Sequence, residues 1–120
     1  MTGSHRFDED LLDSLPLPLS SFFVLFALTE GEKHGYRIMQ DIRKLSEGSF
    51  SLGPATLYTT IKRLTERSLV SEISNSTESR RRTYVLTSAG KRLLGAEFHR
   101  QQALLDLARS RGLLKYGGRK

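Results

Sequence analysis

The 120-residue sequence contains no cysteine, no tryptophan and only three prolines. Without cysteine, a disulfide scaffold, a thiolate metal site and a cysteine nucleophile are all excluded. The longest apolar run, from Phe22 to Leu28, has seven residues, whereas a membrane-spanning helix needs about 20. The amino end also lacks the basic and apolar regions of a secretory signal. We therefore expect a soluble, cytoplasmic protein of single-domain size with no membrane partner.

The charged residues are distributed unevenly along the chain. There are 19 Lys and Arg against 13 Asp and Glu, which gives a formal net charge of +6. Residues 1–30 carry a balance of −4, residues 31–78 a balance of +1, and residues 79–120 a balance of +9. A basic segment this concentrated favours a polyanionic partner such as nucleic acid. An ordinary solvated surface explains the charge alone equally well.

Local sequence signals predict two helices in the first part of the chain. The prolines of Leu15–Pro18 separate an acidic lead from a helix that Ser20 or Ser21 caps. This helix is apolar almost all round up to about Leu28, which is typical of a central core helix. Gly35 opens a second helix, whose predicted buried stripe is spaced i, i+4, i+7 and consists of Ile38, Ile42 and Leu45.

The second part of the chain predicts a third helix, a hairpin and a long last helix. Gly53 and Pro54 start the third helix, because proline is tolerated at the first helical position, and it runs to about Arg67. Two strands follow, near residues 69–74 and 82–86, joined by polar turn residues. Thr87 caps a last helix to about Arg111, which Gly90 and Gly95 weaken locally.

This order of elements predicts a mainly α fold with a small β-hairpin. It matches a winged helix-turn-helix domain, in which the hairpin forms the wing, followed by a long C-terminal dimerisation helix. We assign residues 1–18 to a partly disordered acidic lead, 19–87 to the DNA-binding domain, 88–112 to the dimerisation helix and 113–120 to a flexible tail. The alternative is a winged-helix protein–protein interaction module without specific DNA binding.

The third helix has the division of faces that a recognition helix needs. Leu57, Ile61 and Leu64 make its core stripe. Hydroxyls, a small residue and cations occupy the opposite arc, where they can contact base edges and phosphates. An ordinary amphipathic helix with a solvated face would look similar. The predicted DNA-binding residues on this helix are Ala55, Thr56, Tyr58, Thr59, Lys62 and Arg63.

The hairpin adds a second set of candidate DNA-binding residues. Arg80, Arg81 and Arg82 begin its returning strand beside the polar tip. Three cations next to a projecting loop suit contact with phosphates or with the narrow minor groove.

Three stretches in this order resemble the PadR family of winged-helix transcription regulators. They are residues 33–38 (KHGYRI), 55–64 (ATLYTTIKRL) and 82–90 (RTYVLTSAG), and the likeness extends from Leu19 to Arg92. The resemblance implies that the second stretch is the DNA-reading helix. It also implies that the Gly35-Tyr36 opening of the preceding helix lies near the DNA backbone, which makes Tyr36 a candidate contact.

The resemblance further implies a function and an assembly. A chain that stops after one C-terminal helix resembles the short form of the family, a homodimer whose last helices pair. It implies a repressor of transcription that binds a pseudo-palindromic promoter site as double-stranded DNA. In some members of the family a small aromatic or drug-like effector releases the repressor, so such a ligand is a further expected partner.

The last helix predicts a dimer independently of the family. Five of its residues are spaced alternately four and three positions apart, which is a heptad seam with one polar member. They are Leu94, Phe98, Gln101, Leu105 and Ala108. The alternative is a helix that folds back on its own core. Twofold symmetry would present two recognition helices to successive major grooves.

The sequence gives no support to an enzyme. The three histidines, His5, His34 and His99, have no metal-ligand spacing. No glycine-rich phosphate loop follows a predicted strand, and no Ser-His-acid set is indicated. We therefore expect neither catalysis, nor a metal, nor a cofactor.

Overall fold

The computed structural model describes residues 12–73 and 82–114. The chain divides into two compact units, one of which is Leu17–Leu94 and the other residues 1–16 with 95–120. The acidic lead before residue 12, the hairpin tip with Arg80 and Arg81, and the tail from residue 115 lie outside the described residues. The elements are α2 (Leu19–Ala27), η1 (Leu28–Glu30), β1 (Lys33–His34), α3 (Gly35–Leu45), α4 (Pro54–Glu66), β2 (Val70–Ile73), β3 (Thr83–Leu86) and α5 (Ser88–Ser110).

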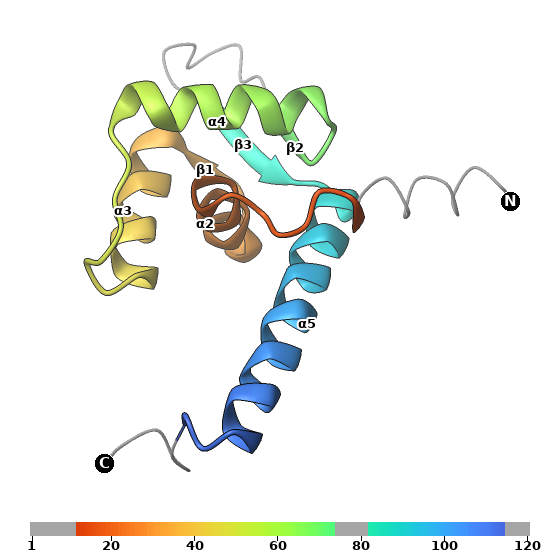
Figure 1. Ribbon diagram of the computed structural model, residues 1–120. Coiled ribbons are helices and arrows are strands. Elements are labelled where there is room, and N and C mark those ends of the chain that lie inside the picture. The colour runs from red at the N-terminus through yellow and green to blue at the C-terminus, as the bar shows by residue number, and fades with distance from the viewer. Residues whose placement is uncertain (1–11, 74–81, 115–120) are drawn as a thin grey trace, which may run out of the picture. The chain divides into compact units, whose positions relative to one another are not determined.

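Helix α2 is the centre of the larger unit, as its apolar sequence predicts. It packs against both α3 and α4 and is seen nearly end-on in Figure 1. Val24 and Leu25 are completely buried. The predicted cap by Ser20 or Ser21 is wrong, because Pro18 is the N-cap and no side chain caps the helix. The Pro18 carbonyl accepts the first helical hydrogen bond, from the Phe22 N–H at 2.9 Å.

Helix α3 begins at Gly35, as predicted, and buries Ile38 and Ile42 completely. The prediction that Leu45 completes the buried stripe is wrong, since its side chain is 40% exposed. The helix ends at this residue, and Asp41 occupies the inner face one turn earlier. The acidic residue Asp41 is therefore buried beside Ile38 and Ile42, on the face of α3 that the spacing predicted to be purely aliphatic.

The sheet has three antiparallel strands in the order β1-β3-β2. Strands β2 and β3 are the predicted hairpin, with Val70 opposite Leu86 and Ile73 opposite Thr83. Strand β1 is an addition to the predicted fold. It pairs with the other edge of β3, which makes β3 the central strand.

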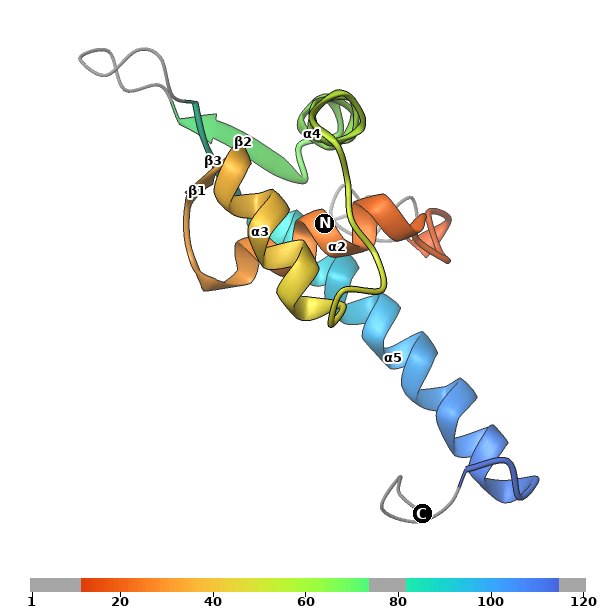
Figure 2. The ribbon, with the colours of Figure 1, turned by 90° about the vertical axis from the view of Figure 1, so that its left-hand side faces the viewer.

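Helix α4 starts as predicted, with Gly53 as N-cap and Pro54 at its first position. Leu57, Ile61 and Leu64 are each at most 3% exposed, which confirms the predicted core stripe. Figure 2 looks nearly down the axis of α4, with α3 running diagonally below it and the β2–β3 hairpin beside it. This arrangement of α3, α4 and hairpin is a winged helix-turn-helix.

Helix α5 begins with the predicted threonine cap. The Gly90 N–H donates to Thr87 Oγ1 at 3.0 Å, and the same hydroxyl donates to the Ser68 carbonyl at 2.7 Å. Among residues 12–73 and 82–114, no helix combines the length and apolar character that crossing a membrane requires.

Candidate nucleic-acid interface

The outer face of α4 carries the predicted recognition residues. Because Leu57, Ile61 and Leu64 hold the opposite side of the helix in the core, these residues are left in solvent. The structure brings six of the predicted DNA-binding residues together on one exposed helical surface, namely Ala55, Thr56, Tyr58, Thr59, Lys62 and Arg63. We call this set the α4 surface.

One threonine of α4 has a structural role instead. Thr60 is 3% exposed, and its hydroxyl donates to the Thr56 carbonyl at 2.8 Å. The amino end of α4 has no side-chain cap and no acidic residue in its first turn. The partial positive charge of a helix N-terminus is therefore not neutralised locally and is compatible with a nearby phosphate.

Helix α3 places a second aromatic residue in solvent next to the α4 surface. Tyr36 lies in the first turn of α3 and is 62% exposed, while Tyr58 of α4 is 45% exposed. Exposed tyrosines of this kind combine a flat apolar ring with a hydroxyl that can donate to a phosphate or a base.

The wing contributes Arg82 as its described cation. Its side chain is 70% exposed and forms an ion pair with Glu72 across the hairpin, with Nε 3.6 Å from Oε2. A phosphate would have to compete with this carboxylate for the guanidinium. Arg80 and Arg81, the other two predicted wing residues, lie outside the described residues.

Tyr84 is a buried residue at the base of the wing. Burial raises the pKa of its hydroxyl above the ordinary value, and the negative charge of Glu72 and the proximity of Tyr58 act in the same direction. The charge of Arg82 and a hydrogen bond with it oppose this rise. The neutral tyrosine is therefore the form that the folded wing favours.

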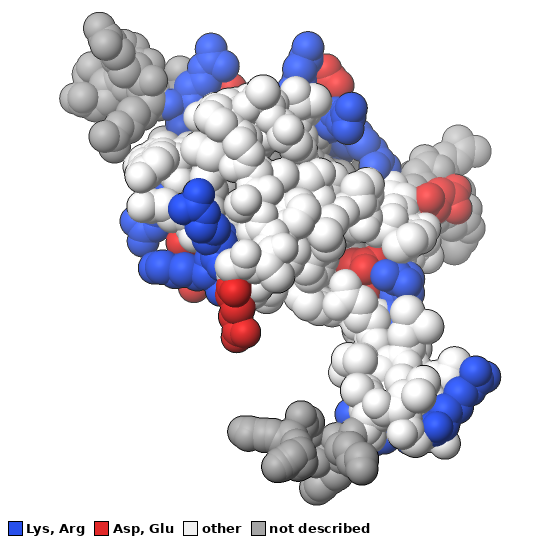
Figure 3. Space-filling model, turned by 60° about the vertical axis from the view of Figure 1, so that its left-hand side comes forward, with Lys and Arg blue, Asp and Glu red and all other residues white. Residues whose placement is uncertain are grey.

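The charges around this region are mostly positive. Figure 3 shows Lys and Arg side chains around a broad uncharged surface, with fewer carboxylates among them. Such a surface can neutralise phosphates at its rim and leave uncharged groups to meet bases.

An ion-pair cluster connects β1 with α3 and the end of α2. Lys33 Nζ donates to the Ala27 carbonyl at 2.7 Å, to Glu30 Oε1 at 3.1 Å and to Asp41. Arg37 Nε lies 3.5 Å from the other oxygen of Asp41. The side chains of Lys33 and Asp41 are only 9% and 13% exposed. The cluster thus fixes β1 to α3 and to the end of α2.

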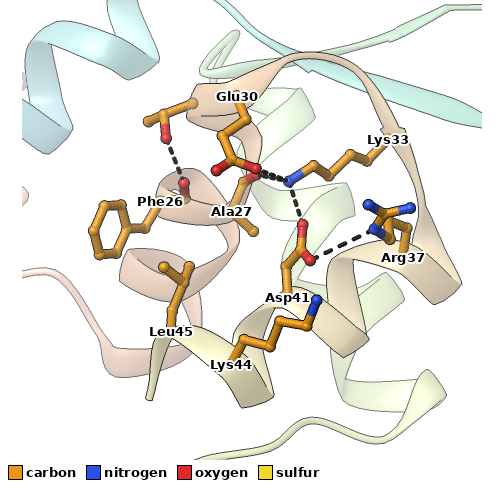
Figure 4. Close-up of a pocket in the computed structure, with 9 residues that line it drawn as sticks. Phe26, Ala27, Glu30, Lys33, Arg37, Asp41, Lys44 and Leu45 are labelled. Carbon is orange, nitrogen blue, oxygen red and sulfur yellow. Dashed lines mark hydrogen bonds and ion pairs between the residues drawn. The ribbon is translucent and has the colours of Figure 1, made fainter. Parts of the chain in front are cut away.

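A small cavity lies beside this cluster. Its volume is about 230 Å³, and Figure 4 shows Phe26 and Leu45 on one side and the charged residues on the other. Pockets for drug-sized molecules usually measure about 300–1,000 Å³. The charged groups Lys33 and Asp41 are also already paired with each other. We therefore do not assign the effector to this cavity.

Helix α5 leaves part of the predicted dimer seam exposed. Phe98 and Leu105 are 36% and 46% exposed, whereas Gln101 and Ala108 are half-buried. Leu94, the first predicted seam residue, is only 4% exposed within the single chain, because this turn of α5 belongs to the unit Leu17–Leu94. The exposed part of the seam therefore begins at Phe98.

The polar member of the seam is held by a neighbour on the same helix. Gln101 Nε2 donates to Glu97 Oε2 at 2.8 Å, and Arg100 binds the same carboxylate through two nitrogens, at 2.7 and 3.0 Å. Glu97 itself is 2% exposed. The hydrogen bond that Arg100 donates to Glu97 raises the pKa of Arg100, and the charge of Glu97 acts in the same direction.

The fold defines the class as a winged helix-turn-helix protein, with the α4 surface as its exposed helical face. The family model described as the transcriptional regulator PadR-like family matches residues 24–96. This match covers more than half of the chain, and the chain therefore belongs to the PadR-like family of transcriptional regulators.

The sequence is also similar to an individual protein of longer length. A 37.1 kDa uncharacterized protein of transposon Tn4556 from Streptomyces fradiae is 38% identical over 80 residues, which are 67% of this chain. The chain spans only 22% of the length of that relative.

Solved structures share the fold at low sequence identity. A PadR family transcription regulator from Clostridium difficile R20291 superposes with a TM-score of 0.67 at 23% identity, covering 78% of this chain and 97% of that one. Bacillus subtilis PadR in complex with operator DNA gives a TM-score of 0.56 at 23% identity, covering 66% of this chain and 47% of that one.

Sequence reasoning missed the Lys33–Asp41 pair and the close approach of the Tyr58 side chain to Gly35, where a Cβ atom would overlap it. The one available signal for the pair was an acidic residue beside Ile38 and Ile42 on the apolar stripe of α3. An acid at such a position needs a buried cation. No local pattern identifies Lys33 as that cation, since the lysine precedes the helix.

Proposed function

We propose that this chain is a homodimeric transcriptional repressor that binds a pseudo-palindromic promoter site in a sequence-specific manner. In each protomer α4 enters the major groove, and the wing contacts the adjacent phosphates through Arg82 together with Arg80 and Arg81. Tyr36 contacts the DNA backbone. We propose this regulatory role in place of any enzymatic one.

The observation that carries the proposal is the composition of the α4 surface. Thr56 and Thr59 offer hydroxyls to base edges near the amino end of the helix, and Ala55 offers a methyl group to thymine. Lys62 and Arg63 lie further along and can neutralise phosphates. Family membership and the operator-bound Bacillus subtilis relative support the same role.

The proposed dimer forms through α5. Phe98, Leu104, Leu105 and Leu107 are 36–52% exposed, and a helix with so many exposed apolar side chains gains from a partner. A second α5 packed on this surface would bury Phe98 and Leu105 in a coiled-coil-like seam with Leu104 at its edge, whereas Leu107 lies outside that seam. Two recognition helices related by a twofold axis would then meet half-sites about 34–36 Å apart.

We further propose that a small aromatic or drug-like effector releases the repressor at this seam. The exposed ring of Phe98 and the side chain of Leu105 offer the apolar contacts that such a ligand needs. Ligand binding between paired helices would change the distance between the recognition helices. This part of the proposal fails if no compound of a screened aromatic library lowers affinity for the promoter.

Fluorescence anisotropy with promoter and random duplexes at several salt concentrations tests the proposed DNA binding. Affinity for the protein's own promoter should fall linearly with salt on a log–log plot. Arg63→Ala should weaken promoter binding and reduce the magnitude of the salt slope by about one, the effect of one lost phosphate contact.

The matched control is Arg109→Ala, which removes the same charge from an exposed pair with Asp106 on α5. This variant should leave the slope unchanged. Equal affinity for promoter and random DNA would contradict the repressor. Absence of any salt-dependent binding would favour the protein–protein interaction module instead.

A further inference from the structure

Gly35, the first residue of α3, is a close-contact site for the recognition helix. Gly35 is buried and follows His34, the extended N-cap of the helix. A Cβ atom at Gly35 would overlap sterically with the hydroxyl oxygen of Tyr58 and would lie 2.7 Å from its Cζ and 3.1 Å from its Cε1. The phenol of Tyr58 therefore occupies the space that any other side chain at position 35 would need.

This contact lies where α3 leaves the sheet. Lys33 and His34, immediately before Gly35, pair with Tyr84 and Thr83 of the central strand β3. Tyr84 is 3% exposed, and Tyr58 is one of the groups that raise its pKa, so the Tyr58 side chain is also close to the wing strand. One ring from α4 thus reaches the junction between α3 and the wing.

The buried side of α4 packs on the core of the unit, and the helix contacts α2, α3 and β2. Leu57, Ile61 and Leu64 form a single buried stripe. Aliphatic packing along one stripe is not directional, so it resists lifting of the helix more than rotation about its own axis. The Tyr58 ring lies at the side of the helix against the backbone of Gly35 and restricts that rotation.

We propose that Tyr58 is a positioning residue for DNA recognition and that Gly35 leaves the space in which its ring packs. The contact sets the rotation of α4 relative to α3 and the wing, and hence the direction in which Thr56 and Thr59 point. This inference rests on the proposed sequence-specific DNA binding. It assigns Tyr58 a role within the protein in addition to any contact with DNA.

A rotated recognition helix should lose specificity before it loses general affinity. Hydrogen bonds to base edges require defined directions, whereas cation–phosphate attraction tolerates small shifts. The informative quantity is therefore the ratio of the dissociation constants for random and promoter DNA, which we call the discrimination ratio.

The test is a double-mutant cycle with Gly35→Ala, Tyr58→Ala and the double variant. Gly35→Ala should lower the discrimination ratio by about tenfold, the effect of losing roughly one base contact. In the Tyr58→Ala background the same methyl group meets no ring, so Gly35→Ala should change the ratio by no more than about twofold, the usual limit for independent sites.

Gly95→Ala is the matched control, since a Cβ at Gly95 meets nothing within 4 Å. It should leave the discrimination ratio unchanged. Circular dichroism melting defines a temperature at which every variant is folded, and the ratios are measured below it. If Gly35→Ala does not fold, the double variant must fold and match Tyr58→Ala within about twofold.

The positioning role is overturned if Gly35→Ala has the same effect in both backgrounds, or no effect when Tyr58 is present. It is also overturned if the discrimination ratio of the double variant is more than about twofold lower than that of Tyr58→Ala. If the unaltered chain does not discriminate promoter from random DNA, the proposed function fails first and the positioning role fails with it. The two failures are therefore distinguishable in one assay.

Discussion

Replacement of Asp41 by alanine tests how the DNA-binding unit is held together. The carboxylate binds Lys33 and Arg37, and the Lys33 and Asp41 side chains are only 9% and 13% exposed. Removal of one partner from a buried ion pair costs about 3–5 kcal/mol, because the other charge remains buried without its counter-ion. Here Lys33 keeps the Ala27 carbonyl and Glu30 as partners.

Because these partners remain, we expect the free energy of unfolding to fall by about 3 kcal/mol, the lower end of that range. Glu30 compensates little, because its side chain is 82% exposed and exposed pairs contribute about 0–1 kcal/mol. For a unit of this size, each kcal/mol lowers the melting temperature by about 4–8 °C. Asp41→Ala should therefore lower it by about 12–24 °C.

Urea unfolding monitored by circular dichroism measures this loss. The matched control is Asp106→Ala, because Asp106 pairs with Arg109 on the surface and is 61% exposed. That variant should cost no more than about 1 kcal/mol. The double variant Lys33→Met/Asp41→Leu replaces both charges by apolar groups and should recover most of the stability lost in Asp41→Ala.

Two results would refute this reasoning. The first is a loss in Asp41→Ala no larger than that in Asp106→Ala, which would mean that the cluster is screened by solvent like a surface pair. The second is a double variant at least as unstable as Asp41→Ala, which would mean that the groups do not interact.

Three further predictions concern the helix start, the wing and the dimer. Gly90→Ala should lower the free energy of unfolding in urea by about 2 kcal/mol, because a Cβ there would collide with the Leu69 carbonyl. Gly95→Ala should instead raise it by about 1 kcal/mol. A Gly90→Ala chain more stable than the Gly95→Ala chain would contradict this packing. Because burial raises the pKa of Tyr84 above 10.0, the unfolded chain releases this proton first. Stability should fall as pH rises above 10.0, less steeply in Tyr84→Phe, and parallel urea-midpoint curves would oppose this assignment. Leu105→Glu should convert the dimer into a monomer in light scattering at micromolar concentration; an unaltered chain that is already monomeric would refute the proposed pairing.

The helices could be predicted from the sequence because their signals are local. Gly53 and Pro54 start α4, and Thr87 caps α5, through contacts within a few residues. The 3.6-residue period then identifies the buried side of α4, since Leu57, Ile61 and Leu64 point in one direction in any straight helix. The α4 surface followed from the same geometry, as the side opposite to that stripe.

The third strand and the ion-pair cluster could not be predicted in this way. Strand β1 has only two residues, too few for an alternating pattern, and it exists because β3 offers it an edge. Lys33 meets Asp41 only once α3 has packed against α2. The exposure of Leu45 and the burial of Leu94 likewise depend on where neighbouring elements end.

The sequence by itself determined the order of the helices, the hairpin and the side of α4 that faces outward, because hydrophobic periodicity and helix-terminal residues act over a few positions. Only the tertiary structure decided why particular small residues are needed. From the sequence, Gly90 weakens a helix and Gly35 begins one. In the fold, Gly90 lies against the Leu69 carbonyl and Gly35 against the ring of Tyr58. These requirements arise because residues far apart in the chain are packed to contact distance, and no local pattern records which atoms will meet.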